Sequence, residues 1–239
     1  SRPVQVVVPN PPGGSNDIFA RALSKRLADA WGRPVVVENR PGASASVGAA
    51  YVAKAAADGH TLLVVSSSFA TNAAVQKNQP FDAAKDFAPV AMLGKGPFIL
   101  GVANGLPAKA IAELVALAKS KPGALNYASS GPGSINQFAT ELFKSAAGVQ
   151  MTHVPYKGMS AAVGDLVGGH VDVLIASVPS ILSAVRSGKV RALGVTSAKR
   201  SQSLPDLPSI AEAGVKGYEV STWYGVLAPA KTPRAIVTR

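Results

Sequence analysis

The chain has 239 residues, of which 47% are hydrophobic and 15% are charged, and its formal net charge is +11. This composition is typical of a folded globular protein and excludes a disordered chain, and no apolar run approaches the roughly 20 residues that a membrane-spanning helix needs. The absence of cysteine excludes disulfide bonds and thiolate metal sites, and it suits an oxidising compartment.

The net positive charge raises the question of nucleic-acid binding. Such a protein should gather its basic residues on one face and interleave them with aromatic side chains for stacking. Here the basic residues are scattered, with Lys199 and Arg200 as the densest group, and the aromatic residues are sparse and lie mostly in apolar segments. The charge therefore favours long-range attraction of small anions over binding of nucleic acid.

Short apolar strands alternate with amphipathic helices along the chain. In the first part we expect strands at 4–8, 35–38, 61–66, 89–93 and 98–103, and helices at 18–31 and 47–56. The pattern then restarts, with helices expected at 111–119, 135–147, 161–167 and 181–187, and strands at 125–128, 151–154, 171–176 and 191–196. This alternation predicts an α/β protein with mostly parallel sheets.

Two glycine-rich segments each stand between an expected strand and an expected helix. They are PPGGSND at 11–17 and SSGPGSINQF at 129–138. Such turns leave backbone N–H groups exposed at a helix N-terminus, which is an arrangement that binds anions. In open α/β sheets, ligands bind beyond the carboxyl ends of the strands, where both segments lie. Neither segment matches a nucleotide-binding fingerprint, and the alternative is that both are ordinary strand–helix turns.

A ligand with two negative ends would satisfy two helix N-termini, each of which carries roughly half a positive charge. An amino acid or a monocarboxylate would fill one end and leave the other to water. The pair of segments therefore favours a dicarboxylate.

The sequence shows no catalytic constellation. The three histidines, His60, His153 and His170, lie far apart without ligand spacing and are interpreted as structural or surface residues. Serines at the ends of strands, at 66–68 and 177, could hydrogen-bond a carboxylate or cap helices, and no G-x-S-x-G nucleophile elbow is present. We interpret Asp17 as structural, because a carboxylate in the first turn of a helix favours the helix dipole and can hold the loop. The aromatic residues Phe69, Tyr156, Trp223 and Tyr224 are candidates either for lining a cleft or for core packing.

Several longer runs, in order, cover nearly the whole chain: VVVPNPPGGSNDIFARAL, VVVENRPGASASVGA, ADGHTLLV, KDFAPVAML, NYASSGPGSINQFATELF, HVPYKG, SGKVRALGVTSAKR, LPDLPSIAEAG and STWYGVLAPAKTP. In these runs the chain resembles the Bug-type (TctC-like) periplasmic solute receptors, the extracytoplasmic binding proteins of tripartite tricarboxylate transporters. The segments PGG-x-x-D, VENRPGA and HVPYKG are specific in combination.

The resemblance implies a type II periplasmic binding protein fold, in which two α/β lobes are joined by crossing strands and a ligand cleft lies between them. The first lobe would comprise 1–100 and 221–239, shortened at its C-terminus, and the second lobe would comprise 101–220. The crossing strands are expected near 98–103 and 221–228.

The resemblance also implies that two strand–helix loops hold a ligand carboxylate, mainly through backbone N–H groups and ordered waters. Together with the serines that end strands and the aromatic candidates, it predicts these ligand-binding residues: Asn10, Gly13, Gly14, Ser15, Ser67, Ser68, Ser130, Gly131, Gly133, Ser134, Gln137, Tyr156, Ser177 and Trp223. The chain departs from the family at Asn10, where an aromatic or aliphatic residue is common, and at 136–137, where a histidine is frequent. An amide at Gln137 donates a hydrogen bond without titrating, so these departures leave the identity of the ligand open.

We therefore expect a periplasmic receptor that binds a small dicarboxylate, which could be aliphatic, aromatic such as terephthalate, or an acidic amino acid. The receptor would deliver it to the membrane subunits of a tripartite tricarboxylate transporter, without catalysis, cofactor, metal or nucleic acid. We expect a monomer whose signal peptide is absent or already removed. One alternative is a sensor that signals to a partner protein. Another is an enzyme that uses the same cleft, for which the sequence offers no nucleophile–base pair or metal constellation.

Overall fold

The computed structural model describes residues 2–238 and divides the chain into two compact units. Unit 1 comprises Ser1–Gly94 and Trp223–Arg239, and unit 2 comprises Lys95–Thr222. Two strands, β4 (Phe87–Ala103) and β9 (Ser221–Pro229), have residues in both units. Whether these units are the functional lobes, with the bounds expected from the sequence, stays a prediction.

Unit 1 contains three complete strands, parts of two more, and helices on either side of them. Its elements are β1 (Val4–Val8), α1 (Ser15–Trp31), β2 (Val35–Asn39), a 3₁₀ turn η1 (Ala43–Ala45), α2 (Ser46–Ala53), β3 (Thr61–Ser66), α3 (Ser68–Val75), the first part of β4, most of β9, and α8 (Arg234–Val237). β1 pairs in parallel with β2 and β3, and β9 is antiparallel to β3.

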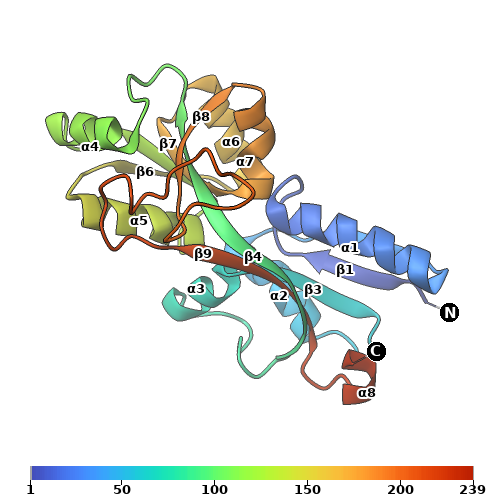
Figure 1. Ribbon diagram of the computed structural model, residues 1–239. Helices are drawn as coiled ribbons and strands as arrows, with labels where there is room; N and C mark the ends of the chain where they lie inside the picture. Colours follow the sequence, from blue (N-terminus) through green and yellow to red (C-terminus); the bar gives the residue numbers. More distant parts are fainter. Residues whose placement is uncertain (1, 239) are drawn as a thin grey trace. The chain divides into compact units, whose positions relative to one another are not determined.

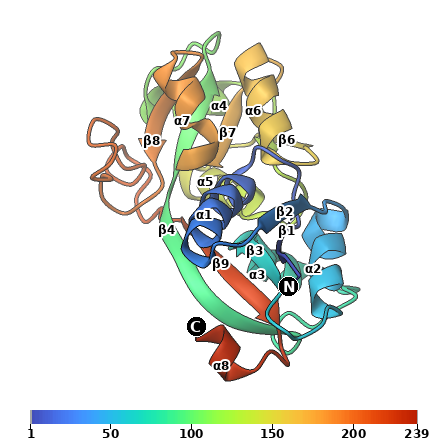
Figure 2. The same cartoon turned by 90° about the vertical axis from the view of Figure 1, so that its right-hand side faces the viewer.

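The sheet of unit 1 is covered on both faces, as Figures 1 and 2 show. Successive side chains of a strand point to opposite faces, so Val6 and Val8 pack with Ala20 of α1, while Val7 packs with residues of α2. Burial on both faces explains why β1 is an unbroken run of apolar residues over its last three positions. Because β1 and β3 are parallel, their carboxyl ends lie at the same edge of the sheet, and the loop after β1 begins there.

Unit 2 repeats this layered arrangement. Its elements are the second part of β4, α4 (Ile111–Ser120), β5 (Asn126–Ser129), α5 (Ile135–Ala147), β6 (Thr152–Pro155), α6 (Met159–Gly168), β7 (Val173–Ser177), α7 (Val178–Arg186) and β8 (Val190–Val195). β5 is parallel to β6 and β7, whereas β4 is antiparallel to β7 and β8. Helices α4 and α5 pack on one face of this sheet and α6 and α7 on the other.

The α/β fold is confirmed, but two expectations about its elements are wrong and one helix was missed. The sheets are mixed rather than mostly parallel, because β4 and β9 run against their neighbours. The two strands expected around Gly94 and Gly96 form the single 17-residue strand β4. Helix α3 was not expected, since its eight residues lack a clear apolar period.

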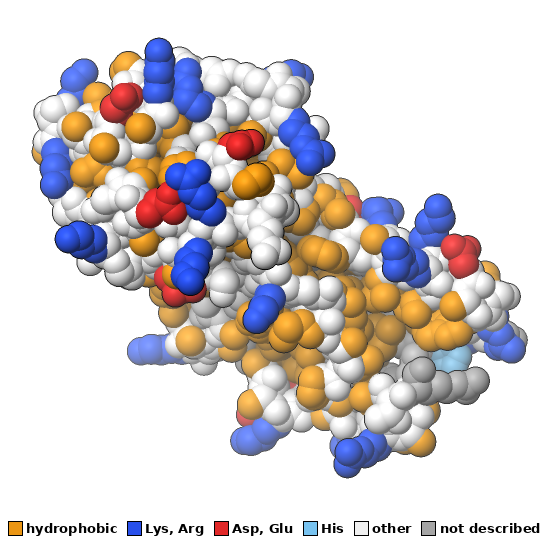
Figure 3. Space-filling model, viewed as in Figure 1, with side chains coloured by type: hydrophobic (Ala, Val, Ile, Leu, Met, Phe, Trp, Pro, Cys, Tyr) orange, Lys and Arg blue, Asp and Glu red, His pale blue; other side chains and the backbone are white. Residues whose placement is uncertain are grey.

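The surface agrees with the interpretation of the net charge. On the face shown in Figure 3, Lys and Arg side chains are spread over the surface and do not form one continuous patch. Within residues 2–238, no helix combines the length and the apolarity that crossing a membrane would require.

Candidate functional site

In unit 1, the loop between β1 and α1 is held in place by side chains of the helix that follows it. Gly13 has a φ of 84°, which favours glycine, and Gly14 is the N-cap residue of α1 without a side-chain cap. The N–H of Gly13 donates to Oδ2 of Asp17 at 3.0 Å. This bond confirms that Asp17 holds the loop.

Asp17 is itself buried in a small polar network. Its Oδ2 accepts from Nε of Arg21 at 2.9 Å, and its Oδ1 accepts from Nδ2 of Asn39 at 3.0 Å. Burial alone would raise the pKa of the Asp17 carboxyl, but these hydrogen bonds and the charge of Arg21 lower it overall. The carboxylate therefore stays ionised and bonded at neutral pH.

Asn10 and Asn16 connect the start of this loop to α1. Nδ2 of Asn16 donates to Oδ1 of Asn10 at 2.6 Å, and the carbonyl of Asn10 accepts from Nδ2 of Asn39 at 3.1 Å. The hydroxyl of Tyr224 on β9 donates to Oγ of Ser15 at 3.0 Å. The loop is thus fixed at its beginning, at Gly13 and at the first residue of α1.

In unit 2, the loop between β5 and α5 is built in the same way. Gly131 and Gly133 have φ values of 127° and 77°. The N–H of Gly133 donates to Oε1 of Gln137 at 2.8 Å, and Oγ of Ser134 accepts from the N–H of Gln137 at 3.4 Å. Ser134 and Gln137 thereby form a variant of the capping box, in which the glutamine reaches one residue further back.

Asn136 connects this second loop to the sheet beneath it. Its Oδ1 accepts from Oγ of Ser130 at 3.0 Å, and its Nδ2 donates to the carbonyl of Ile175 on β7 at 2.9 Å. Asn136 is buried, so both ends of its amide are satisfied inside the unit.

The two loops share three identical residues at a spacing of 120 positions. Pro12, Gly13 and Asn16 correspond to Pro132, Gly133 and Asn136. The contacts correspond as well: Gly13 bonds to the residue four positions later, as Gly133 does, and Asn10 bonds to the residue six positions later, as Ser130 does. The sequence analysis missed Asn16 and Asn136 as site residues, although the shared spacing P-G-x-x-N could have identified them.

Three of the backbone N–H groups predicted to bind the ligand already donate hydrogen bonds within the protein. The N–H groups of Gly13 and Gly133 are taken by Asp17 and Gln137, and the N–H of Gly131 donates to Oγ of Ser129 at 3.1 Å. For the N–H groups of Gly14 and Ser130, the structure gives no acceptor within residues 2–238. Three of the predicted glycines therefore shape the loops through their own N–H bonds.

The other predicted residues lie at the ends of neighbouring elements. Ser67 precedes α3 and its N–H donates to the carbonyl of Trp223 at 3.0 Å, while Ser68 is the first residue of α3. Ser177 ends β7, and its Oγ is 2.9 Å from that of Ser180. The Tyr156 hydroxyl donates to Oδ2 of Asp165 at 2.6 Å, and burial together with this carboxylate raises its pKa to about 12.

These residues divide between the two units. Those in unit 1 are Asn10, Gly13, Gly14, Ser15, Ser67, Ser68 and Trp223, and those in unit 2 are Ser130, Gly131, Gly133, Ser134, Gln137, Tyr156 and Ser177. Each unit by itself thus presents one glycine-rich loop at a helix N-terminus. Within residues 2–238, no group of three or more His, Cys, Asp or Glu side chains could hold a metal ion.

Comparison with protein families gives one match over most of the chain. Residues 19–239 match the family described as tripartite tricarboxylate transporter family receptor, TctC. A UPF0065 protein in the tcbD-tcbE intergenic region of Pseudomonas sp. strain P51 is 43% identical over 240 residues, which cover all of this chain and 71% of that protein. Protein BugT of Bordetella pertussis is 41% identical over 240 residues, covering 99% of this chain and 74% of that protein.

Solved structures match along the same length. R. palustris Rpa4515, solved with adipate, has 41% identity and a TM-score of 0.97, covering 99% of this chain and 80% of that one. The periplasmic binding protein BugD has 35% identity and a TM-score of 0.93, covering 99% and 79%. MatC of Rhodopseudomonas palustris, solved with bound malate, has 35% identity and a TM-score of 0.92, covering 99% and 81%.

Proposed function

The chain belongs to the family of tripartite tricarboxylate transporter receptors, and from this membership we propose that it is the periplasmic receptor for a small aliphatic dicarboxylate. Receptors of this family are periplasmic solute-binding proteins. In this proposal the solute is bound unchanged and is passed to the membrane subunits of a transporter, and the two units act as lobes that close on it.

The equivalence of the two loops carries this proposal. Each loop places a helix N-terminus, with its partial positive charge, beside backbone N–H groups that can meet a carboxylate. Two equivalent anion sites, one in each unit, suit one ligand with a carboxylate at each end. We assign one carboxylate to the loop that contains Gly14 and Ser15 and the other to the loop that contains Ser130 and Ser134.

The solved relatives support an aliphatic ligand. Rpa4515 was solved with adipate and MatC with malate, so two relatives with at least 35% identity hold dicarboxylates of different length. The remaining proposed residues, Asn10, Ser67, Ser68, Gln137, Tyr156, Ser177 and Trp223, would surround the ligand or position the loops. Aromatic dicarboxylates and acidic amino acids are the competing ligands.

Isothermal titration calorimetry tests the proposal. The probes are adipate, malate, glutamate and terephthalate, with acetate as the matched monocarboxylate. We expect an aliphatic dicarboxylate to bind at least about a hundredfold more tightly than acetate, which corresponds to about 2.7 kcal/mol. Equal affinity for acetate and the dicarboxylates would refute the assignment of two anion sites. Preference for terephthalate would refute the aliphatic assignment, and preference for glutamate would show that the ligand is an acidic amino acid.

A pair of glycine variants tests where the ligand binds. Gly131 has a φ of 127°, and a Cβ added there would lie 3.3 Å from the carbonyl oxygen of Tyr156. Gly214 has a similar φ of 112° and nothing within 4 Å of an added Cβ. Alanine at either position meets a positive φ and strains the backbone, but only Gly131 lies in a loop that we assign to the ligand. G131A should therefore weaken binding at least about tenfold, and G214A by less than about twofold. Equal effects of the two changes would contradict a role of this loop in binding.

A further inference from the structure

Beneath the Gly131 loop, Ser129 and His153 form a contact that the proposed ligand contacts do not use. Ser129 is the last residue of β5 and is fully buried. Its Oγ lies 2.7 Å from Nε2 of His153, accepts from the N–H of Gly131 at 3.1 Å, and lies 3.2 Å from the carbonyl oxygen of Gly131. The Ser129 hydroxyl is therefore within hydrogen-bond distance of the His153 imidazole and of both the N–H and the carbonyl of Gly131.

The hydroxyl of Ser129 has one proton and two possible acceptors for it. When His153 is neutral with its proton on Nδ1, Nε2 accepts the hydroxyl proton, and Oγ meets Gly131 only as an acceptor. When His153 takes up a proton from solvent, Nε2–H donates to Oγ instead. The hydroxyl then rotates and donates to the carbonyl of Gly131, which already accepts from the N–H of Ser134 at 3.2 Å and so gains a second donor.

We propose that His153 is a positioning residue for the Gly131 loop and that, through the Ser129 hydroxyl, it links the binding of an anionic solute at this loop to the uptake of one proton. This inference rests on the proposed function, because it assigns a carboxylate of the solute to this loop. The protonated arrangement adds a positive charge beneath the loop and one further hydrogen bond, from the Ser129 hydroxyl to the Gly131 carbonyl. A bound anion favours that arrangement.

Three side chains with ionisable groups face His153. The ring of Tyr127 on β5 stacks on the imidazole with the ring centroids 4.8 Å apart. Glu141 and Lys144 face it from α5, where the carboxylate of Glu141 accepts from the Tyr127 hydroxyl and pairs with the Lys144 ammonium at 2.8 Å. Burial lowers the pKa of His153, Glu141 opposes this decrease and Lys144 adds to it.

These surroundings set the direction of the linkage. With its pKa lowered, His153 is largely neutral near pH 8 and can take up a proton as the pH falls. Binding of an anion raises the pKa of His153, so by reciprocity a proton on His153 increases the affinity for the anion. The affinity should therefore increase from pH 8 to pH 6, a range in which carboxylates with pKa values near 4 stay ionised.

Nitrogen-resolved NMR of the imidazole tests the contact without any ligand. At pH 8, His153 should carry its proton on Nδ1, with Nε2 accepting from Ser129. A proton on Nε2 at this pH would overturn the proposal, because the Ser129 hydroxyl would then already donate to Gly131 in the neutral state.

Calorimetry with adipate and malate at pH 6, 7 and 8 tests the linkage. The wild-type protein should bind about fivefold more tightly at pH 6 than at pH 8, at the low end of usual coupling between sites. In H153Q, the amide oxygen can accept the Ser129 proton but cannot ionise, so the affinity at pH 8 should be kept and the pH dependence lost. S129A should also lose the pH dependence, whereas H170Q, which changes an exposed histidine of the same unit, should keep it.

The outcomes separate this inference from the proposed function. Binding whose affinity changes by less than about twofold over this range, or an unchanged pH dependence in H153Q or S129A, would overturn the inference alone. Absence of binding of adipate and malate at every pH would overturn the proposed function and this inference with it.

Discussion

Replacement of Asp17 by asparagine removes the charged acceptor that holds the Gly13 loop. The carboxylate accepts from Gly13 and Arg21 through Oδ2 and from Asn39 through Oδ1, and it is almost fully buried. Asparagine keeps one acceptor oxygen, so at least one of these donors would face an NH₂ group instead. The variant D17N should therefore weaken both the fold of unit 1 and the binding of solute.

The magnitude follows from the bonds that are lost. A hydrogen bond to a charged group contributes about 1.5–3 kcal/mol, and a buried donor without an acceptor costs about 1–3 kcal/mol. Since the amide keeps part of the network, we expect the free energy of unfolding of D17N to fall by about 2–3 kcal/mol. Affinity for the dicarboxylate should fall at least about tenfold, because the loop no longer has one fixed geometry.

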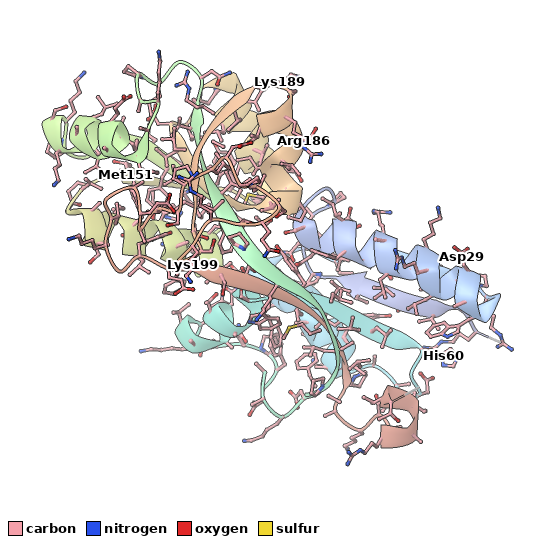
Figure 4. The ribbon with its side chains drawn as sticks, viewed as in Figure 1. Asp29, His60, Met151, Arg186, Lys189 and Lys199 are labelled. Carbon is pink, nitrogen blue, oxygen red and sulfur yellow. The ribbon has the colours of Figure 1, made fainter. Side chains whose placement is uncertain are left out.

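Urea unfolding and calorimetry measure the two effects, and Asp29 supplies the matched control. Asp29 lies on the same helix, where it is exposed and extends away from the unit (Figure 4). D29N makes the same change of charge, and it should alter the free energy of unfolding by less than about 0.5 kcal/mol. If D17N and D29N had the same stability and the same affinity, the proposed role of Asp17 in holding the loop would be wrong.

The pH dependence of this difference has a definite sign. The hydrogen bonds and Arg21 lower the pKa of Asp17 in the folded protein below its ordinary value of 3.8, despite its burial. A lowered pKa stabilises the folded state above the unfolded pKa, and this stabilisation is lost as the pH falls through the folded pKa. The difference between wild type and D17N should thus be complete at pH 7 and decrease below about pH 4.

The remaining predictions concern the fold. Thr196 is buried, and its Oγ1 accepts from the N–H of Phe98 at 2.7 Å and donates to the carbonyl of Val220 at 2.7 Å. Because valine can make neither bond, T196V should lower the free energy of unfolding in urea by about 2–3 kcal/mol. The neighbouring Ser197 is half-buried and its hydroxyl makes one hydrogen bond, to the carbonyl of Lys199 at 2.7 Å, so a cost below that of the control S197A would contradict this. A Cβ at Gly48 would lie 2.8 Å from the Arg40 carbonyl oxygen and from Cα of Pro9, so G48A should cost about 1–3 kcal/mol. A Cβ added at Gly164 in α6 has nothing within 4 Å, so G164A should stabilise the fold by about 0.5–1 kcal/mol. Equal changes in the free energy of unfolding for G48A and G164A would refute the close approach at Gly48.

The sequence predicted most elements because their apolar periods are strong. The bounds expected for β1, β3 and α5 are those of the structure. β4 was divided in error because Gly94 and Gly96 are typical of a break, yet a strand whose two parts pair in different units can continue through glycine. The antiparallel partners of β3, β4 and β7 depend on pairings between distant segments, which local periodicity does not contain.

The site could be predicted only in part. The two loops follow from their glycines and from the strands before them, and the role of Asp17 follows from its place in the first turn. The contact between Ser129 and His153 could not be foreseen, because it depends on the parallel register that pairs Tyr127 with His153 across β5 and β6. The acceptors of the glycine N–H groups likewise required the side-chain conformations of Asp17 and Gln137.

The way in which each loop is held also has a consequence for the rate of solute capture. Gly13 and Gly133 are fixed by side chains four residues later on their own helices, so the chain itself orders both loops. A segment that is ordered by its own chain loses little conformational entropy when a solute arrives. Association should therefore approach the rate of productive diffusional encounter, and variants that release Asp17 or Gln137 should slow it, since the loop would have to order during each encounter.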